Sequence, residues 1–132
     1  MVCPRGGRVA RLDTKQIRRG ELWTVDLRHT IGWEIAKKRP ALIISSDQIN
    51  SESPLVIIIP VSSKIPQITG FEKILLGKKE SNLEKDSVIL VNQIRTVDKT
   101  RLGKKIGHIS EGKLEEVEDA LKLVLGLLPL DI

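Results

Sequence analysis

Short apolar segments, separated by polar stretches, follow one another along most of this chain. In residues 20–27 every second residue from Trp23 onwards is apolar, which is typical of a strand with one buried face. Residues 40–45 and 55–61 are almost entirely apolar, and runs of this length predict strands that are covered on both faces. Further strands are predicted over residues 71–76, 87–96 and 106–109.

The last segment has helical periodicity. Ser110 is suited to cap the start of a helix, and Pro129 follows its end. Apolar residues recur between them every three or four positions, at Leu114, Val117, Leu121, Val124, Leu125 and Leu128. Five or six short strands followed by one helix predict a mainly β fold with some α structure. We expect a compact, partly closed antiparallel barrel with the C-terminal helix packed on it.

The net charge of +5 is concentrated at the N-terminus. Residues 1–20 hold six basic side chains and one acidic side chain, whereas the other 16 basic and 16 acidic residues balance. Residues 1–16 show no apolar periodicity, so we expect a basic flexible tail there and one domain over residues 17–132. The tail could add sequence-independent attraction to phosphates, and a solvated tail without a binding role explains it equally well.

The scarcity of cysteine, histidine and aromatic residues excludes several kinds of site. Cys3 is the only cysteine, and His29 and His108 are far apart in sequence, so neither a disulfide nor a zinc site is expected. The sequence contains no phosphate-binding glycine loop. We therefore predict no metal and no cofactor. No segment is apolar enough for a membrane span or a signal peptide, which favours a cytoplasmic protein without a membrane partner.

The loop that precedes the strand at 40–45 is rich in cations. Four Arg or Lys residues between positions 28 and 39 outnumber the one acid, Glu34. Pro40 favours an extended backbone at Arg39, which would hold the guanidinium in a fixed direction. A fixed guanidinium can bind a phosphate through two hydrogen bonds and stabilise a transition state with added negative charge. A solvated loop has the same composition, so these residues alone leave both interpretations open.

Two other polar segments carry weaker signals. Ser62 and Ser63 follow an apolar strand, and hydroxyl groups there can bind phosphate oxygens or cap a turn. Residues 92–96 interleave amide, guanidinium and hydroxyl groups, which can contact base edges but also keep an exposed strand soluble.

Taken together, these segments resemble the MazF/PemK family of toxins. The similarity extends over about residues 17–128, nearly the whole predicted fold. The residues that carry it are Arg19-Gly20-Glu21, Gly32-x-Glu34, Arg39-Pro40-Ala41-Leu42-Ile43-Ile44-Ser45, Asp86-Ser87-Val88, Gln93-Ile94-Arg95-Thr96 and the ending from Asp98 through Ile106-Gly107 to the helix.

The resemblance implies an SH3-like barrel, a homodimer and a small, labile MazE-like antitoxin as partner. It also implies sequence-selective cleavage of single-stranded RNA without a metal. By position, Arg39 matches the catalytic arginine of the family, Glu34 its loop glutamate, and Ser62 its catalytic threonine or serine. Two departures are Ile35 and Lys37, which lie in a stretch that is often rich in glycine.

The remaining site residues are expected to contact RNA. Gln93 matches a position that resembles an RNA-contacting one, and the same role is predicted for Lys37, Lys38, Arg95 and Trp33. The expected reaction is a transesterification, in which the 2′-hydroxyl of the RNA attacks the adjacent phosphate and leaves a 2′,3′-cyclic phosphate and a 5′-hydroxyl. The alternative is a non-catalytic protein of the same fold, either a CcdB-like gyrase poison or a nucleic-acid-binding regulator.

Overall fold

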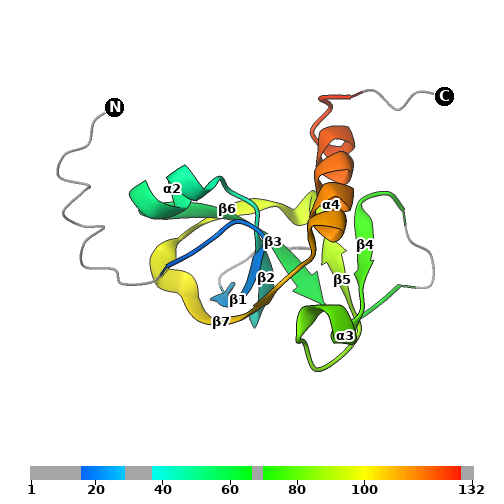
Figure 1. Ribbon diagram of the computed structural model, residues 1–132, viewed down its shortest axis with the longest axis horizontal. Coiled ribbons are helices and arrows are strands. Elements are labelled where there is room, and N and C mark those ends of the chain that lie inside the picture. The colour runs from blue at the N-terminus through cyan, green and yellow to red at the C-terminus, as the bar shows by residue number, and fades with distance from the viewer. Residues whose placement is uncertain (1–15, 29–36, 67–69, 129–132) are drawn as a thin grey trace.

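The computed structural model describes residues 16–28, 37–66 and 70–128 (Figure 1). Within these ranges a mainly antiparallel β fold is followed by one long helix, as the sequence predicted. The strands are β1 (Glu21–Asp26), β2 (Lys38–Ile43), β3 (Leu55–Ser62), β4 (Lys73–Leu76), β5 (Ser87–Leu90), β6 (Arg95–Asp98) and β7 (Leu102–His108). The α-helices are α2 (Asp47–Glu52), α3 (Lys78–Ser81) and α4 (Glu111–Val124), and the short 3-10 helices are η1 (Val91–Gln93) and η2 (Lys99–Arg101).

The strands form one antiparallel sheet in the order β4-β5-β3-β2-β1-β7, and β6 pairs with β3. Within the described residues no pairing joins β4 to β7, so the barrel stays partly open. Strand β3 is the centre of the sheet because it pairs with β2, β5 and β6. Pro60 lies between the part of β3 that pairs with β6 and the part that pairs with β5. A residue without an N–H donor is tolerated where a strand changes partner in this way.

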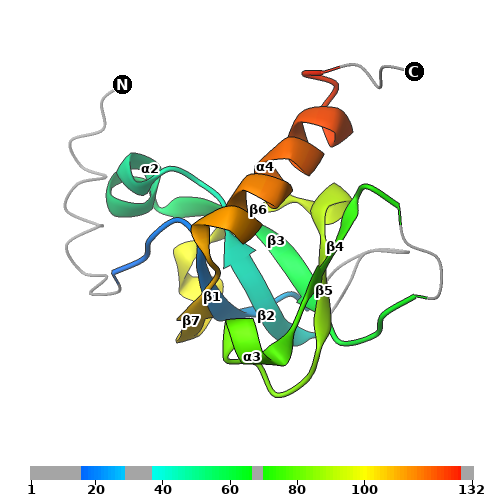
Figure 2. The ribbon, with the colours of Figure 1, turned by 45° about the vertical axis from the view of Figure 1, so that its right-hand side comes forward.

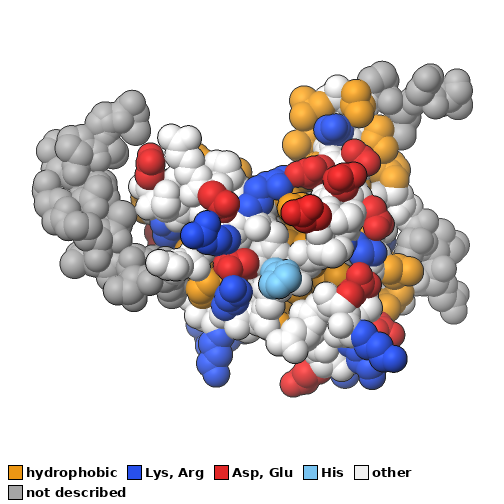
Figure 3. Space-filling model, viewed as in Figure 1, with side chains coloured by type: hydrophobic (Ala, Val, Ile, Leu, Met, Phe, Trp, Pro, Cys, Tyr) orange, Lys and Arg blue, Asp and Glu red, His pale blue; other side chains and the backbone are white. Residues whose placement is uncertain are grey.

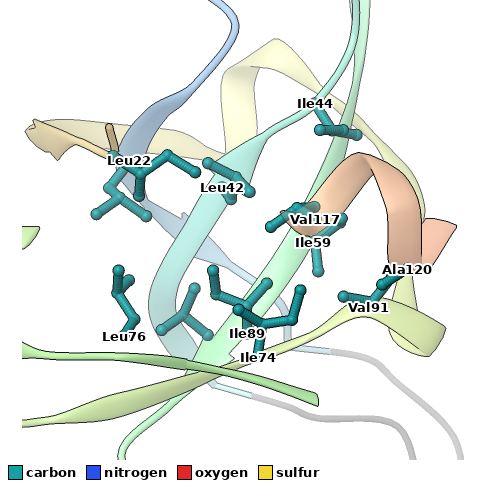
Figure 4. Packing of buried hydrophobic residues seen from close by; sticks show 12 residues of the cluster. Leu22, Leu42, Ile44, Ile59, Ile74, Leu76, Ile89, Val91, Val117 and Ala120 are labelled. Atoms are coloured by element: carbon teal, nitrogen blue, oxygen red, sulfur yellow. The ribbon is translucent and has the colours of Figure 1, made fainter. Parts of the chain in front are cut away.

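Two hydrophobic clusters lie on opposite sides of β2 and β3. We call the first the barrel cluster; it contains Ile17, Trp23, Val25, Leu27, Ala41, Ile43, Val56, Ile58, Val97 and Leu102. The second, the helix cluster, contains Leu22, Leu42, Ile44, Ile59, Val61, Ile74, Leu76, Ile89, Val91, Ile109, Val117 and Ala120 (Figure 4). Successive residues of β2 and β3 point to opposite faces and so enter different clusters. This confirms that the two most apolar segments are covered on both sides.

Helix α4 covers the helix cluster. Figure 2 shows it crossing the face of the sheet at β2 and β3, with β4 and β5 beside it. The predicted cap is present, since the Oγ of Ser110 accepts a hydrogen bond of 3.1 Å from the backbone N–H of Lys113. Val117 is fully buried and Ala120 nearly so, which fixes the helix on the sheet. None of the described helices is long and apolar enough to cross a lipid bilayer.

A buried carboxylate joins the first strand to the last. Glu21 is 7% exposed and accepts hydrogen bonds of 2.9 Å from the indole of Trp23 and from the backbone N–H of Arg18. Lys105 of β7 forms an ion pair of 2.8 Å with its other oxygen. Burial raises the pKa of Glu21, but the hydrogen bonds from Lys105, Trp23 and Arg18 outweigh it, and the net pKa lies below its ordinary value.

The structure corrects the sequence interpretation at three places. Residues 87–96 form two strands separated by η1, whereas the sequence predicted one continuous strand. Helix α2 was not predicted from the sequence, because its only buried residue is the polar Asn50 and it has no apolar stripe. Helix α3 was not predicted either, because its four residues are too few to show a helical period.

Candidate active site

A cleft of about 590 Å³ lies where β2 begins and β3 ends. One part of its lining comes from strands of the barrel, and another comes from the connection between α3 and β5. The lining residues are Thr24, Lys37, Lys38, Arg39, Pro40, Val61, Ser63, Asn82, Leu83, Glu84, Lys85, Ser87 and Ile106. Cations outnumber acids in this lining, so the cleft is a candidate site for an anionic ligand.

Three successive cations, residues 37–39, line the cleft at the start of β2. The backbone of Lys37 is in the left-handed region, with φ of 78°, and its carbonyl accepts a hydrogen bond of 2.9 Å from the N–H of Leu27. This conformation favours glycine and costs a lysine on the order of 1–2 kcal/mol. Lys37 is also one of the two positions at which this sequence departs from the glycine-rich pattern. Lys37 therefore adds an ammonium group to the cleft at a position whose backbone conformation favours glycine.

The nearest acid on β1, Asp26, attracts Lys38 but forms its side-chain hydrogen bonds with Arg28. Asp26 is bound by Arg28, whose guanidinium donates hydrogen bonds to both carboxylate oxygens, at 2.8 Å from Nε to Oδ1 and 3.1 Å to Oδ2. These bonds lower the pKa of Asp26 and hold it as a carboxylate engaged with Arg28. Neither Lys37 nor Lys38 forms an ion pair with a described residue. Both ammonium groups are exposed and can attract an anion.

Acidic side chains gather elsewhere. Figure 3 shows them over helix α4, whose acids are Glu111, Glu115, Glu116, Glu118 and Asp119. No residue of α4 is among the described residues that line the cleft. The described residues thus include a group of acids on helix α4 and a positive cleft at one end of the sheet, a distribution that sequence totals do not reveal.

The structure brings together three of the predicted site residues, Lys37, Lys38 and Arg39. Ser62 lies beside the cleft and not in its lining: it is 6% exposed, and its Oγ accepts a hydrogen bond of 3.1 Å from the N–H of Lys64. The next residue, Ser63, is exposed and lines the cleft.

The other predicted RNA contacts come from elsewhere in the fold. Gln93 is in η1, and Arg95 of β6 pairs with Ile58; neither lines the cleft. Trp33 and Glu34 lie outside the described residues. Sequence reasoning missed the residues contributed by the α3–β5 connection, because the segment is polar and its approach to β2 depends on the tertiary fold.

A sequence profile of the PemK-like, MazF-like toxins of type II toxin-antitoxin systems matches residues 18–125. The chain belongs to this toxin family. The match includes every strand of the sheet and the whole of α4, so the toxin fold and the described domain coincide.

Solved structures agree with the assignment of the toxin fold. MazF from Deinococcus radiodurans superposes with a TM-score of 0.74 at 24% identity, over 85% of this chain and 98% of that chain. An endoribonuclease from a mycobacterial species gives a TM-score of 0.71 at 21% identity, over 90% and 99% of the two chains. A mycobacterial endoribonuclease in complex with its cognate antitoxin gives 0.68 at 20% identity, over 89% and 100%.

Proposed function

We propose that this toxin is an endoribonuclease that cleaves single-stranded RNA at selected sequences and so inhibits translation. The observation that carries the proposal is the cation-lined cleft at the start of β2, at the place where the family resemblance puts the catalytic arginine. An RNA backbone presents one phosphate per nucleotide, and the described lining of the cleft, with four cations and one acid, matches that charge.

The proposed reaction needs little from the protein. The nucleophile is the 2′-hydroxyl of the substrate, so the protein has to align the strand, stabilise charge and move protons. Arg39 stabilises the negative charge that develops on the phosphorus oxygens. Ser62 donates a hydrogen bond to a non-bridging oxygen, and Glu34 acts as the base or orients Arg39. The leaving group is the 5′-oxygen of the next nucleotide, which takes up a proton.

The register of the sheet supports a joint role for Arg39 and Ser62. The β2–β3 ladder ends at the pair Ala41 with Pro60. Two residues further along each strand, the same register leads to Arg39 on β2 and Ser62 on β3. Residues two apart on a strand share a face, so both side chains start from the same side of the sheet.

The partners proposed are RNA, a second copy of the chain and a cognate MazE-like antitoxin. Membership of a toxin-antitoxin family supports the antitoxin, and the mycobacterial relative was solved with its own. The exposed leucines at the end of α4, Leu125, Leu127 and Leu128, are apolar surface of the kind that association covers. We propose the cytoplasm, where messenger RNA is translated, as the place of action.

The test is cleavage of a long single-stranded RNA by the purified protein in excess EDTA. We expect fragments with 5′-hydroxyl ends, which a kinase phosphorylates without prior phosphatase treatment. A substrate with a 2′-deoxy sugar at the cleaved linkage should resist, because the nucleophile is absent. Hydrolysis that needs magnesium, or cleavage of the deoxy linkage, would refute the transesterification. Intact RNA under all conditions would favour a non-catalytic toxin.

A further inference from the structure

The segment of residues 82–85 lines the cleft together with residues 37–39, yet the proposed mechanism gives it no role. It connects α3 to β5 and comes from a different part of the sequence from the catalytic candidates. A substrate strand in the cleft would therefore contact residues 82–85, which we call the second wall of the cleft.

This second wall is held in place from two directions. Asn82 has a left-handed backbone, with φ of 63°, and its side-chain amide donates a hydrogen bond of 2.8 Å to the carbonyl of Ile106 on β7. At the other end, the hydroxyl of Ser87 donates a hydrogen bond of 2.9 Å to the carbonyl of Lys85. The backbone that carries Lys85 is thus fixed before any ligand arrives, which lowers the entropy lost on binding.

Gly107 allows the wall to approach β7. A Cβ at this position would lie 3.1 Å from the carbonyl oxygen of Ser81 and 3.2 Å from the Cβ of Asn82. Real Cβ atoms rarely come so close to other atoms, so a larger residue would push the segment away. The absence of a side chain at Gly107 therefore sets the position of the wall relative to the sheet.

The charge of Lys85 is available to a ligand. Lys85 is exposed and forms no ion pair with a described residue. The two acids on either side of the segment accept backbone N–H groups: Glu80 from Gly77 at 2.8 Å and Asp86 from Lys78 at 2.9 Å. Glu84 is the only acid among the described residues that line the cleft.

We propose that Lys85 binds a phosphodiester of the RNA on the second wall, so that the strand lies between this wall and residues 37–39. This inference rests on the proposed function and adds to it a backbone contact at a nucleotide other than the cleaved one. A lysine that contacts only a phosphate adds affinity without reading the base. Lys85 therefore positions the strand, while selection of the cleavage sequence depends on other residues.

The experiment compares Lys85→Ala with Lys79→Ala in the full-length protein. Lys79 is the matched control because it is an exposed lysine of α3, close in sequence, that does not line the cleft. The probe is a single-stranded oligoribonucleotide with 2′-O-methyl sugars, whose attacking groups are blocked. Binding is measured by fluorescence anisotropy at several salt concentrations, and cleavage kinetics are measured on the unmodified RNA.

We expect Lys85→Ala to weaken binding roughly fivefold for every oligonucleotide sequence and to reduce the salt slope by about 0.7. In cleavage, KM should rise while kcat and the cleavage sequence stay as in the wild type, because the contact is equal in ground and transition states. Lys79→Ala should resemble the wild type in all of these measurements.

The outcomes separate this inference from the proposed function. If the wild type cuts RNA and Lys85→Ala matches Lys79→Ala, the second wall does not bind the strand and only this inference fails. A change of cleavage sequence in Lys85→Ala would also overturn it, since it would show base recognition. If the wild type neither binds the probe nor cuts RNA, both the inference and the proposed function fail.

Discussion

Two charged residues in this structure occupy unfavourable positions, one with a left-handed backbone and one with a buried side chain. Lys37 keeps a left-handed backbone at the cleft, and Glu21 is a carboxylate buried between β1 and β7. Such residues are costly in isolation. The two cases lead to different expectations: Lys37 lines the cleft and is available to a ligand, whereas Glu21 is hydrogen-bonded internally and is expected to affect stability.

At Arg39 the proposed mechanism makes a sharp prediction. We expect Arg39→Ala to lower the cleavage rate on the order of a hundredfold or more, because the charge that stabilises the phosphorane is lost. The fold should persist, since Arg39 is half-buried at the end of a strand and belongs to neither hydrophobic cluster. Single-turnover cleavage and thermal unfolding measure the two effects. Wild-type cleavage by this variant would remove the arginine from the mechanism.

The two adjacent serines provide an internal comparison. Ser62→Ala should slow cleavage less than Arg39→Ala does, because a neutral hydrogen bond stabilises the transition state less than a charged one. Ser63→Ala is the matched control, with the same chemical change one residue further on and in the cleft lining. If Ser63→Ala proves the more damaging in the same single-turnover assay, the hydroxyl of the mechanism is that of Ser63.

Glu21 predicts a pH dependence of stability. Its pKa is lowered in the folded state, so the stabilisation is complete well above its ordinary value of 4.5 and is lost as the pH falls through and below that value. Glu21→Gln should destabilise the protein by about 1–2 kcal/mol at pH 7, where the charge-assisted bonds matter, and by less near pH 4. Urea unfolding at both pH values measures this. Glu115→Gln, at an exposed site of α4, should show neither effect.

At the scale of elements, the contact of the α3–β5 connection with β7 should be sensitive to a single substitution at Gly107. Gly107→Ala adds one Cβ against the backbone of Ser81 and should destabilise the fold by about 1–3 kcal/mol through overpacking. It should also displace the 82–85 segment and weaken binding of single-stranded RNA. Gly112→Ala is the control, because a Cβ there meets no atom within 4 Å. Equal stability and RNA binding in the two variants would contradict the close approach.

The elements also show what the sequence could and could not predict. Apolar alternation located β1, uninterrupted apolar runs located β2 and β3, and helical spacing located α4, because each of these elements buries apolar side chains. Helix α2 buries only Asn50, whose amide donates to the carbonyl of Ser45, so no hydrophobic signal marks it. No hydrophobic signal marks the interruption between β5 and β6 at η1 either, because residues 87–96 have the pattern of one continuous strand.

The candidate site was predictable on one side only. Residues 37–39 are adjacent in sequence and precede a buried strand, so their clustering required no knowledge of the fold. Ser63 and Lys85 reach the same cleft from the end of β3 and from the α3–β5 connection. Their proximity depends on the pairing of β3 with β5, which brings together segments that no local pattern relates.

For the whole molecule, the concentration of basic residues before Ile17 gives a prediction about truncation. Deleting residues 1–16 should leave the fold and the cleavage sequence unchanged, because among the described residues burial begins with Ile17 and the cleft lining with Thr24. The deletion removes four cations and one acid, so RNA binding should become weaker and less dependent on salt. Thermal unfolding, cleavage mapping and a salt titration check these points. A truncated protein that fails to fold or cuts elsewhere would show that the tail belongs to the domain.

The hydrogen bond from Asn82 to the carbonyl of Ile106 has a consequence during synthesis of the protein on the ribosome. The cleft is complete only when β7, the last strand, has emerged, although β1 and β2 emerge first. At synthesis rates of roughly 5–20 residues per second, the delay between β1 and β7 is on the order of ten seconds. The nascent chain therefore lacks a finished cleft while most of its own message is still being read, and translation of that copy is nearly over before the site exists.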